Sequence, residues 1–229
     1  MRVQDASPDA RAVVYAGIQA DPLVARAAEL LERASLEQRV LARAAMNGES
    51  TDTDAWRAMF PTLFGAGVDP GARATSEAIL EASLAVADRG EQVRSQFRGA
   101  IVEALTERLL RGGLAIGAPT ATVRRERRIL FDGVRAEIHP YDVTVEVAGA
   151  AAAIDCKWGA RGISADVLHQ LDDARQHALD DDERLAVALV VFDAARSCAV
   201  RLDRQTAPHE HTRIVGLEDL DTLAEPVSP

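Results

Sequence analysis

Apolar residues recur at helical spacing through the first third of the chain. Residues 8–46 predict helices, because the segment from Leu23 to Ala45 carries apolar residues three and four positions apart with charged residues between them. Pro22 favours the start of the second helix, since proline fits the first helical turn. This part of the chain therefore predicts a helical bundle.

Glycine and proline interrupt this pattern at residues 65–71, which read Gly-Ala-Gly-Val-Asp-Pro-Gly. Such a breaker-rich stretch favours a loop and is the strongest candidate for a domain boundary. We therefore expect an all-helical N-terminal region over residues 1–70 and a second domain over residues 71–229.

The second domain changes from helical spacing to strands separated by turns. Helices are predicted at 74–88, 91–111 (ended by Gly112-Gly113), 164–179 and 217–223. Strands are predicted at 122–131, 134–138, 141–147, a run ending at Lys157, 185–192, 197–203 and 213–216. The run from Leu185 to Phe192 is almost continuously apolar, which is typical of a strand covered on both faces. This order predicts an α/β fold with a mixed sheet flanked by helices.

Composition narrows the class further. The chain has 229 residues, of which 48% are hydrophobic, enough for a sizeable core, and 4% are aromatic. Two cysteines, Cys156 and Cys198, favour a reduced protein without a disulfide framework or a structural zinc site. No apolar run reaches about 18 residues and no signal peptide is recognisable, so we expect a cytoplasmic protein without a membrane segment.

The formal net charge of −10 disfavours a general nucleic-acid binder, but charge is unevenly distributed. Residues 94–128 hold 8 arginines and 3 glutamates, a local net charge of +5. Within them, Arg124, Arg125, Arg127 and Arg128 surround one glutamate. These arginines are candidates for contact with phosphates, and a solvated strand face is the alternative of equal weight.

The segment from Asp142 to Lys157 predicts a hairpin with a turn at Ala148-Gly149. That turn places Asp142 opposite Asp155, and alternation puts Lys157 on the same face as Asp155. Two opposed carboxylates repel one another. A bound divalent cation is the usual reason for keeping such a pair.

Lysine usage supports a special role for the hairpin. The chain has 26 basic residues, and Lys157 is the only lysine among them. A lysine ammonium is a compact charge whose pKa responds to its surroundings, whereas a guanidinium stays protonated. A chain that otherwise uses arginine therefore indicates catalysis, or control of a reacting water, at Lys157.

These residues together resemble the PD-(D/E)xK nuclease superfamily, which has the restriction-endonuclease-like fold. The match comprises Glu103 on the helix before the strands, Asp142, the Asp155-Cys156-Lys157 triplet, and Gln170 on the following helix. It covers about 70 well-matched residues, from Gly99 to Gln170. The order of these residues is much more specific than any one of them.

The resemblance implies hydrolysis of phosphodiester bonds with Mg²⁺, for which Mn²⁺ can substitute. Asp142, Asp155 and the backbone carbonyl of Cys156 would bind the metal, and Glu103 would hold a ligating water or a second ion. Lys157 would position or deprotonate the attacking water, or stabilise negative charge. In several branches of the superfamily a glutamine stands where Gln170 does, and it would orient water or phosphate.

The family pattern often has proline directly before the first aspartate, whereas Tyr141 separates Pro140 from Asp142 here. Asp132 in the preceding turn is therefore a rival first ligand. A catalytically inactive relative that binds nucleic acid or protein is the main alternative, and an unrelated α/β protein is the second.

The expected substrate is DNA, with RNA as the alternative, and the resemblance suggests a restriction or defence setting. Endonuclease and exonuclease action both stay open. We expect the helical N-terminal region to form a homodimer or to dock a partner protein, because its negative charge disfavours nucleic acid.

Overall fold

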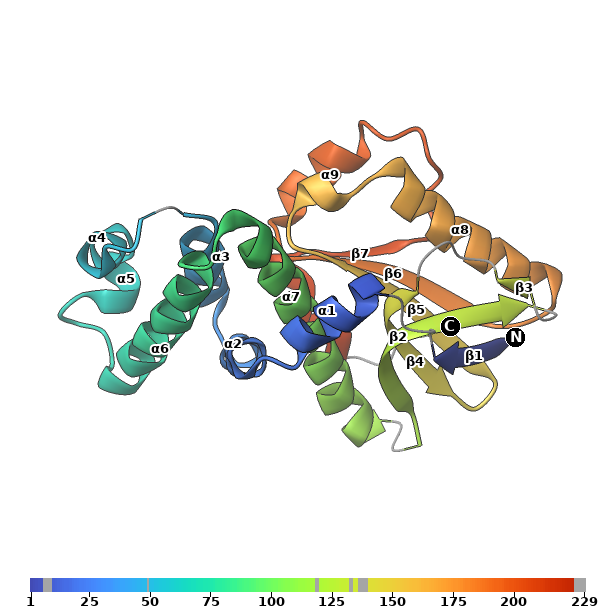
Figure 1. Ribbon diagram of the computed structural model, residues 1–229, viewed down its shortest axis with the longest axis horizontal. Helices are drawn as coiled ribbons and strands as arrows, with labels where there is room; N and C mark the ends of the chain where they lie inside the picture. Colours follow the sequence, from blue (N-terminus) through green and yellow to red (C-terminus); the bar gives the residue numbers. More distant parts are fainter. Residues whose placement is uncertain (6–9, 49, 118–119, 132–133, 136–139, 225–229) are drawn as a thin grey trace. The chain divides into compact units, whose positions relative to one another are not determined.

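The computed structural model describes residues 1–5, 10–48, 50–117, 120–131, 134–135 and 140–224 (Figure 1). The chain divides into two compact units. The helical unit comprises Ala10–Leu105, and the sheet unit comprises Met1–Asp9 together with Thr106–Pro229. Helix α7 (Glu91–Gly117) contributes its first part to the helical unit and its remainder to the sheet unit.

The helical unit begins with short, well-capped helices. Its elements before α7 are α1 (Ala10–Gln19), α2 (Pro22–Glu32), α3 (Leu36–Asn47), α4 (Thr53–Met59), α5 (Pro61–Phe64) and α6 (Pro70–Ala87). Asp21 caps α2 and Asp69 caps α6, each followed by proline in the first turn. Ser35 and Gln38 form a reciprocal capping box at the start of α3. The start of α2 at Pro22 was predicted, whereas α6 begins at Pro70, earlier than the predicted residue 74. The start of α3 at Leu36 falls inside the segment that was predicted as helical from Leu23 to Ala45.

The boundary predicted near residue 70 differs from the observed division. Helix α6 packs within the helical unit, where Leu80 joins Leu41 in a buried cluster. The buried side chain of Gln38 also donates to Ser76 Oγ of α6 at 3.0 Å. The breaker-rich segment 65–71 therefore links two helices of one unit. The N-terminal region is not wholly helical either, because β1 (Arg2–Asp5) belongs to the sheet.

The sheet is mixed, as expected for this α/β fold. Its strands are β1, β2 (Thr122–Phe131), β3 (Val134–Arg135), β4 (Tyr141–Val147), β5 (Ala150–Lys157), β6 (Leu185–Val191) and β7 (Arg213–Val215). Over the described residues the order is β1-β2-β4-β5-β6-β7, and β3 pairs with β2. The pairs from β1 to β5 are antiparallel, and β5, β6 and β7 are parallel neighbours.

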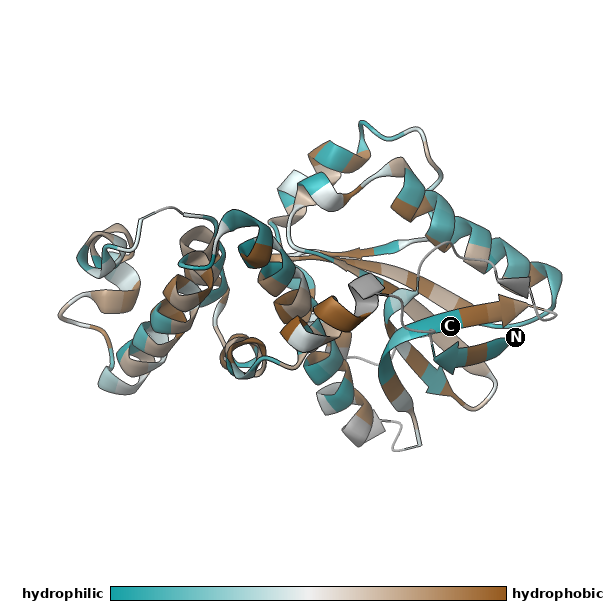
Figure 2. Cartoon of the chain, viewed as in Figure 1, coloured by the Kyte–Doolittle hydropathy of each residue, from teal (hydrophilic) through white to brown (hydrophobic). Residues whose placement is uncertain are grey.

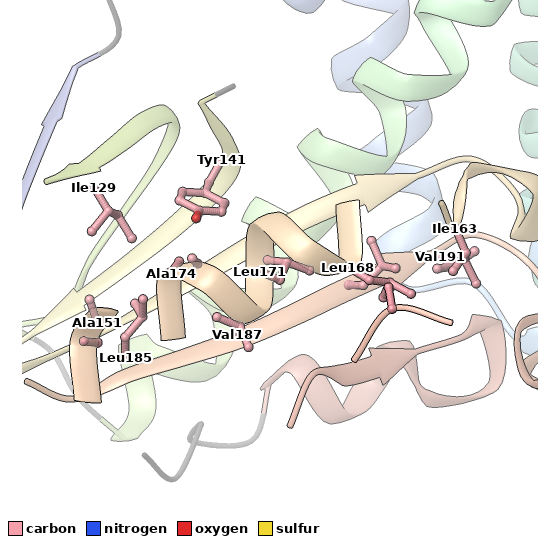
Figure 3. Close-up of a cluster of buried hydrophobic side chains, with 14 of the residues drawn as sticks. Ile129, Tyr141, Ala151, Ile163, Leu168, Leu171, Ala174, Leu185, Val187 and Val191 are labelled. Atoms are coloured by element: carbon pink, nitrogen blue, oxygen red, sulfur yellow. The ribbon is translucent and has the colours of Figure 1, made fainter. Parts of the chain in front are cut away.

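Helices of the sheet unit cover both faces of β5. Helix α8 (Ala165–Asp180) packs Leu168, Leu171 and Ala174 onto residues of β5 and β6 such as Ala151 and Val187 (Figure 3). The visible outer side of α8 is mostly hydrophilic (Figure 2). On the other face, the Cys156 thiol donates to Thr106 Oγ1 of α7 at 3.5 Å. This double cover explains why seven of the eight β5 residues are buried.

A strand prediction after the hairpin requires correction. The strand predicted at 197–203 is helix α9 (Ala195–Leu202). Cys198, Val200 and Leu202 alternate like one face of a strand, but Cys198 and Leu202 also lie one helical turn apart. In the helix, Cys198 is buried and Leu202 packs against the same core, while Val200 is 46% exposed.

Helix α7 also continues to Gly117, past the Gly112-Gly113 pair that was expected to end it. The Asp132-Gly133 turn lies outside the described residues. The last described element is the 3₁₀ segment η2 (Leu217–Ala224), where a helix was predicted. Within the described ranges, no helix is both long and apolar enough to cross a membrane.

Candidate metal and phosphodiester site

The β4–β5 hairpin has the predicted register. The ladder between β4 and β5 ends with the pair Val143 and Ile154, so Asp142 and Asp155 stand at the next opposed position. The turn consists of Ala148 and Gly149, and Gly149 has a φ of +74°, a conformation that favours glycine. The opposed aspartates predicted from the sequence are therefore confirmed.

Lys157 lies between the two carboxylates. Its Nζ is 3.8 Å from Asp142 Oδ2 and 4.0 Å from Asp155 Oδ2. The side chain of Asp155 is 6% exposed, that of Asp142 is 19% exposed and that of Lys157 is 26% exposed. One ammonium thus faces two largely buried carboxylates at distances near the upper limit for an ion pair. The three side chains together carry a formal charge of −1.

The aspartates are also held by backbone amides. The N–H of Cys156 donates to Asp142 Oδ2 at 2.6 Å, and the N–H of Asp142 donates to the Asp155 carboxylate. Each acid therefore binds the backbone of the neighbouring strand at the point where the β4–β5 ladder ends. These two backbone hydrogen bonds hold both carboxylates in place at the end of the hairpin.

Burial dominates the electrostatics of the pair. Burial raises the pKa of Asp142, and both Lys157 and the Cys156 amide oppose that rise. Burial, then the charge of Asp142, raises the pKa of Asp155 to about 7, against the lowering effect of Lys157. The single ammonium therefore does not compensate for desolvation and mutual repulsion of the acids.

The donor set fits a hard divalent cation that keeps part of its own hydration. Mg²⁺ commonly uses one or two carboxylates, with waters and substrate phosphates completing its shell. No group of three or more His, Cys, Asp or Glu side chains suited to a metal occurs among the described residues. The pair Asp142 and Asp155 accordingly suits a shared ion and does not form an all-protein cage.

Cys156 and Gln170 are the other residues predicted for this site, and their roles stay predictions. The Cys156 side chain is buried on the opposite face from Asp155, so the backbone of Cys156 is the part that lies with the acids. Gln170 is buried on α8, and its backbone carbonyl accepts a hydrogen bond from the Tyr141 hydroxyl at 3.4 Å. That contact brings α8 to the residue that precedes Asp142.

Glu103 belongs to the helical unit, where it is 4% exposed. Its carboxylate accepts hydrogen bonds from the Tyr15 hydroxyl at 2.5 Å and from Gln19 Nε2 at 2.7 Å. Helix α1 therefore fastens onto α7 through this acid. Its role in a metal site stays a prediction.

The arginines of β2 do not form one exposed face. Arg124 is exposed, whereas Arg125 pairs with Glu107 at 2.9 Å and Arg128 is half-buried. Arg127 is 7% exposed, and its guanidinium binds the Asp5 carboxylate and the Val3 carbonyl of β1. Arg127 thus joins β1 to β2 inside the unit and has little exposed surface for a phosphate. Phosphate contact by the four arginines stays a prediction.

Sequence reasoning missed Glu126, the single acid within the arginine run. Its neighbours pair with Tyr141 and Val143, so Glu126 stands opposite Asp142, with a φ of +54° that non-glycine residues rarely adopt. Its charge also contributes to raising the pKa of Asp155. An acid alone in a basic run was the available signal.

Gly162 was missed as well. It ends the 3₁₀ turn η1 (Ala160–Gly162), and a Cβ built there would lie 2.9 Å from Lys157 Cβ and 3.1 Å from its Cγ. The absence of a side chain at Gly162 therefore makes room for the stem of Lys157. Asp193 fixes η1 from the other side by accepting the Ala160 N–H at 3.0 Å.

Comparison with known proteins establishes a similar fold and nothing finer. No family model and no curated protein matches the chain. A crystal structure of protein VC1899 from Vibrio cholerae is similar, with a TM-score of 0.50 and 17% sequence identity. The match covers 97% of this chain and 56% of that chain, so this chain spans little more than half of that protein's length. At this identity the similarity concerns the fold alone.

Proposed function

We propose that the sheet unit hydrolyses phosphodiester bonds with Mg²⁺, that Mn²⁺ can replace it, and that the substrate is DNA. The observation that carries this proposal is the pair Asp142 and Asp155, opposed across β4 and β5 with the lone lysine between them. The resemblance to PD-(D/E)xK nucleases, and hence a restriction-endonuclease-like arrangement of the sheet, belongs to the same proposal.

The energetic cost of the opposed aspartates favours a functional role for them over a structural one. A buried pair of like charges destabilises a fold, and neutral residues of similar size would serve the hairpin better. The raised pKa values of Asp142 and Asp155 express that cost. A bound divalent cation would use both carboxylates as ligands. Metal binding would therefore explain why the protein keeps a pair of acids that destabilises its fold.

The residues have distinct proposed roles. Asp142 and Asp155 would hold the ion, and the Cys156 carbonyl is the third proposed ligand. Bound Mg²⁺ supplies a Lewis acid that polarises the phosphate and lowers the pKa of a bound water. Lys157 would orient the attacking water and stabilise negative charge on the phosphate, because its ammonium lies within 4.0 Å of both acids.

Cleavage of supercoiled plasmid and of single-stranded DNA, with Mg²⁺ or Mn²⁺, tests this proposal. We expect activity from the wild type and loss of about 10²-fold or more in Asp155→Asn and Lys157→Arg. Lys157→Arg is the sharper variant, because it keeps a positive charge between the acids but not the compact ammonium. Equal cleavage by these variants and the wild type would contradict the proposal.

Two other outcomes would change the proposed function. Cleavage of RNA but not DNA would change the substrate, and DNA binding without cleavage under either metal would favour an inactive relative that acts as a binding module. Homodimerisation, or docking of a partner protein through the N-terminal helices, stays a separate prediction.

A further inference from the structure

A second basic feature lies beside the lysine, on the turn that follows it. A groove of about 450 Å³ is formed between η1 and α9. Four arginines line it: Arg161 from η1, and Arg196, Arg201 and Arg204 from α9 and the residues just after it. This concentration contrasts with the net charge of −10 for the chain.

Helix geometry explains why the arginines converge. Arg196 and Arg201 lie on α9, where Ser197 and Val200 between them also line the groove, and Arg204 follows two residues after the helix ends. The opposite side of α9 carries Cys198, which is buried in the core of the sheet unit. Arg196 and Arg204 are therefore exposed, while α9 is anchored to the core through its other side.

The groove is also fixed in place. Arg201 Nε donates to the Ile163 carbonyl at 2.9 Å, which ties α9 to the segment just after η1. Asp193 accepts the N–H groups of both Ala160 and Ala194, the residues at which η1 begins and α9 is capped. Asp193 thus holds both walls of the groove, η1 and the start of α9, through hydrogen bonds.

The nearby acids bind backbone amides and not the groove arginines. The Asp193 carboxylate is occupied by backbone amides, and Glu218 accepts the N–H of Ala195. Asp203 follows α9 and is exposed without lining the groove. Across the described residues, no carboxylate lies within ion-pair distance of Arg161, Arg196 or Arg204.

We propose that this groove binds the phosphate backbone of DNA and leads the strand to Lys157. This inference rests on the proposed function for the choice of ligand. The link to the site is η1 itself, since Gly162 packs against the stem of Lys157 and Arg161 beside it lines the groove. Outward-facing guanidiniums without acidic partners suit phosphate oxygens, and they read no base sequence.

The test measures binding without cleavage. Fluorescence anisotropy of a short labelled DNA duplex, with EDTA and over a range of salt concentrations, compares the wild type with the triple variant Arg161→Ala, Arg196→Ala, Arg204→Ala. Each neutralised phosphate contributes ~0.9 to the slope of log K against log salt, so we expect the slope to fall by about 2.7. Affinity at low salt should fall at least ~tenfold.

A charge-matched control replaces three exposed arginines elsewhere, Arg2, Arg26 and Arg33, by alanine. The control should keep the wild-type slope. An equal loss in the control, an unchanged slope in the groove variant, or no DNA binding by the wild type would overturn the inference. A groove-dependent slope without cleavage by the wild type would support the groove and count against the proposed hydrolysis. Cleavage by the wild type, together with a salt slope that the groove variant leaves unchanged, would support the proposed hydrolysis and count against the groove.

Discussion

Replacing Asp155 with asparagine should stabilise the protein in the absence of metal, and only at high enough pH. The buried carboxyl has its pKa raised from 3.8 to about 7, by burial first and by Asp142 second. Asparagine keeps an oxygen that can accept the Asp142 N–H, but it carries no charge. The substitution therefore removes the repulsion while keeping the hydrogen bond.

The sign follows from proton binding in the two states. Between pH 3.8 and about 7 the folded protein holds a proton on Asp155 that the unfolded chain has released. Stability then falls as pH rises through this window, and the full cost is reached above it. A difference of about three pKa units, at 1.36 kcal/mol each, corresponds to about 4 kcal/mol as an upper bound.

Urea denaturation of the wild type and Asp155→Asn, in EDTA and across this pH window, measures the difference. We expect the variant to be more stable by roughly 2–4 kcal/mol above pH 7, with the difference vanishing below pH 3.8. Adding Mg²⁺ should stabilise the wild type and leave the variant unchanged, because the ion binds the folded wild type selectively.

A variant that is less stable than the wild type above pH 7 in EDTA would refute this reasoning. That result would mean that the attraction between Lys157 and Asp155 outweighs burial and repulsion. The hairpin acids would then be an ordinary structural ion pair.

Two further substitutions test the surroundings of the site. Gly162→Ala should slow DNA cleavage by about 10²-fold with unchanged DNA affinity, because the new methyl group displaces the Lys157 stem. Its control is Gly67→Ala, where a Cβ meets nothing within 4 Å, and this variant should keep the wild-type rate. Arg127→Ala should cost about 2–4 kcal/mol in urea denaturation, because it strips buried contacts between β1 and β2, whereas exposed Arg124→Ala should stay within about 0.5 kcal/mol. Equal effects within either pair would count against the argument for that pair.

Local patterns predicted the hairpin well because its register depends on nearby residues. The Gly149 turn and the alternation along β5 suffice to oppose Asp142 and Asp155. Ser164 likewise caps α8 as its type predicts. Where the deciding interaction was local, sequence reasoning reached the observed structure.

Distant contacts decided what sequence reasoning missed. Arg127 looked available for phosphate, but β1 arrives from the start of the chain and buries it. The apolar alternation of Cys198, Val200 and Leu202 suited a strand, and packing against the core selected a helix. The groove arginines are spread over more than 40 residues, so only the fold gathers them.

The N-terminal strand has a consequence for how the protein is made. β1 pairs with Arg127–Leu130, and the bonds of Arg127 to β1 join residues 122 and 124 positions apart. The whole of Ala10–Leu105 is synthesised before β2, so the helical unit can fold while β1 still lacks its partner strand. Closing so long a loop is slow. We therefore expect β1 to dock late, after the helices that separate it from its partner have formed.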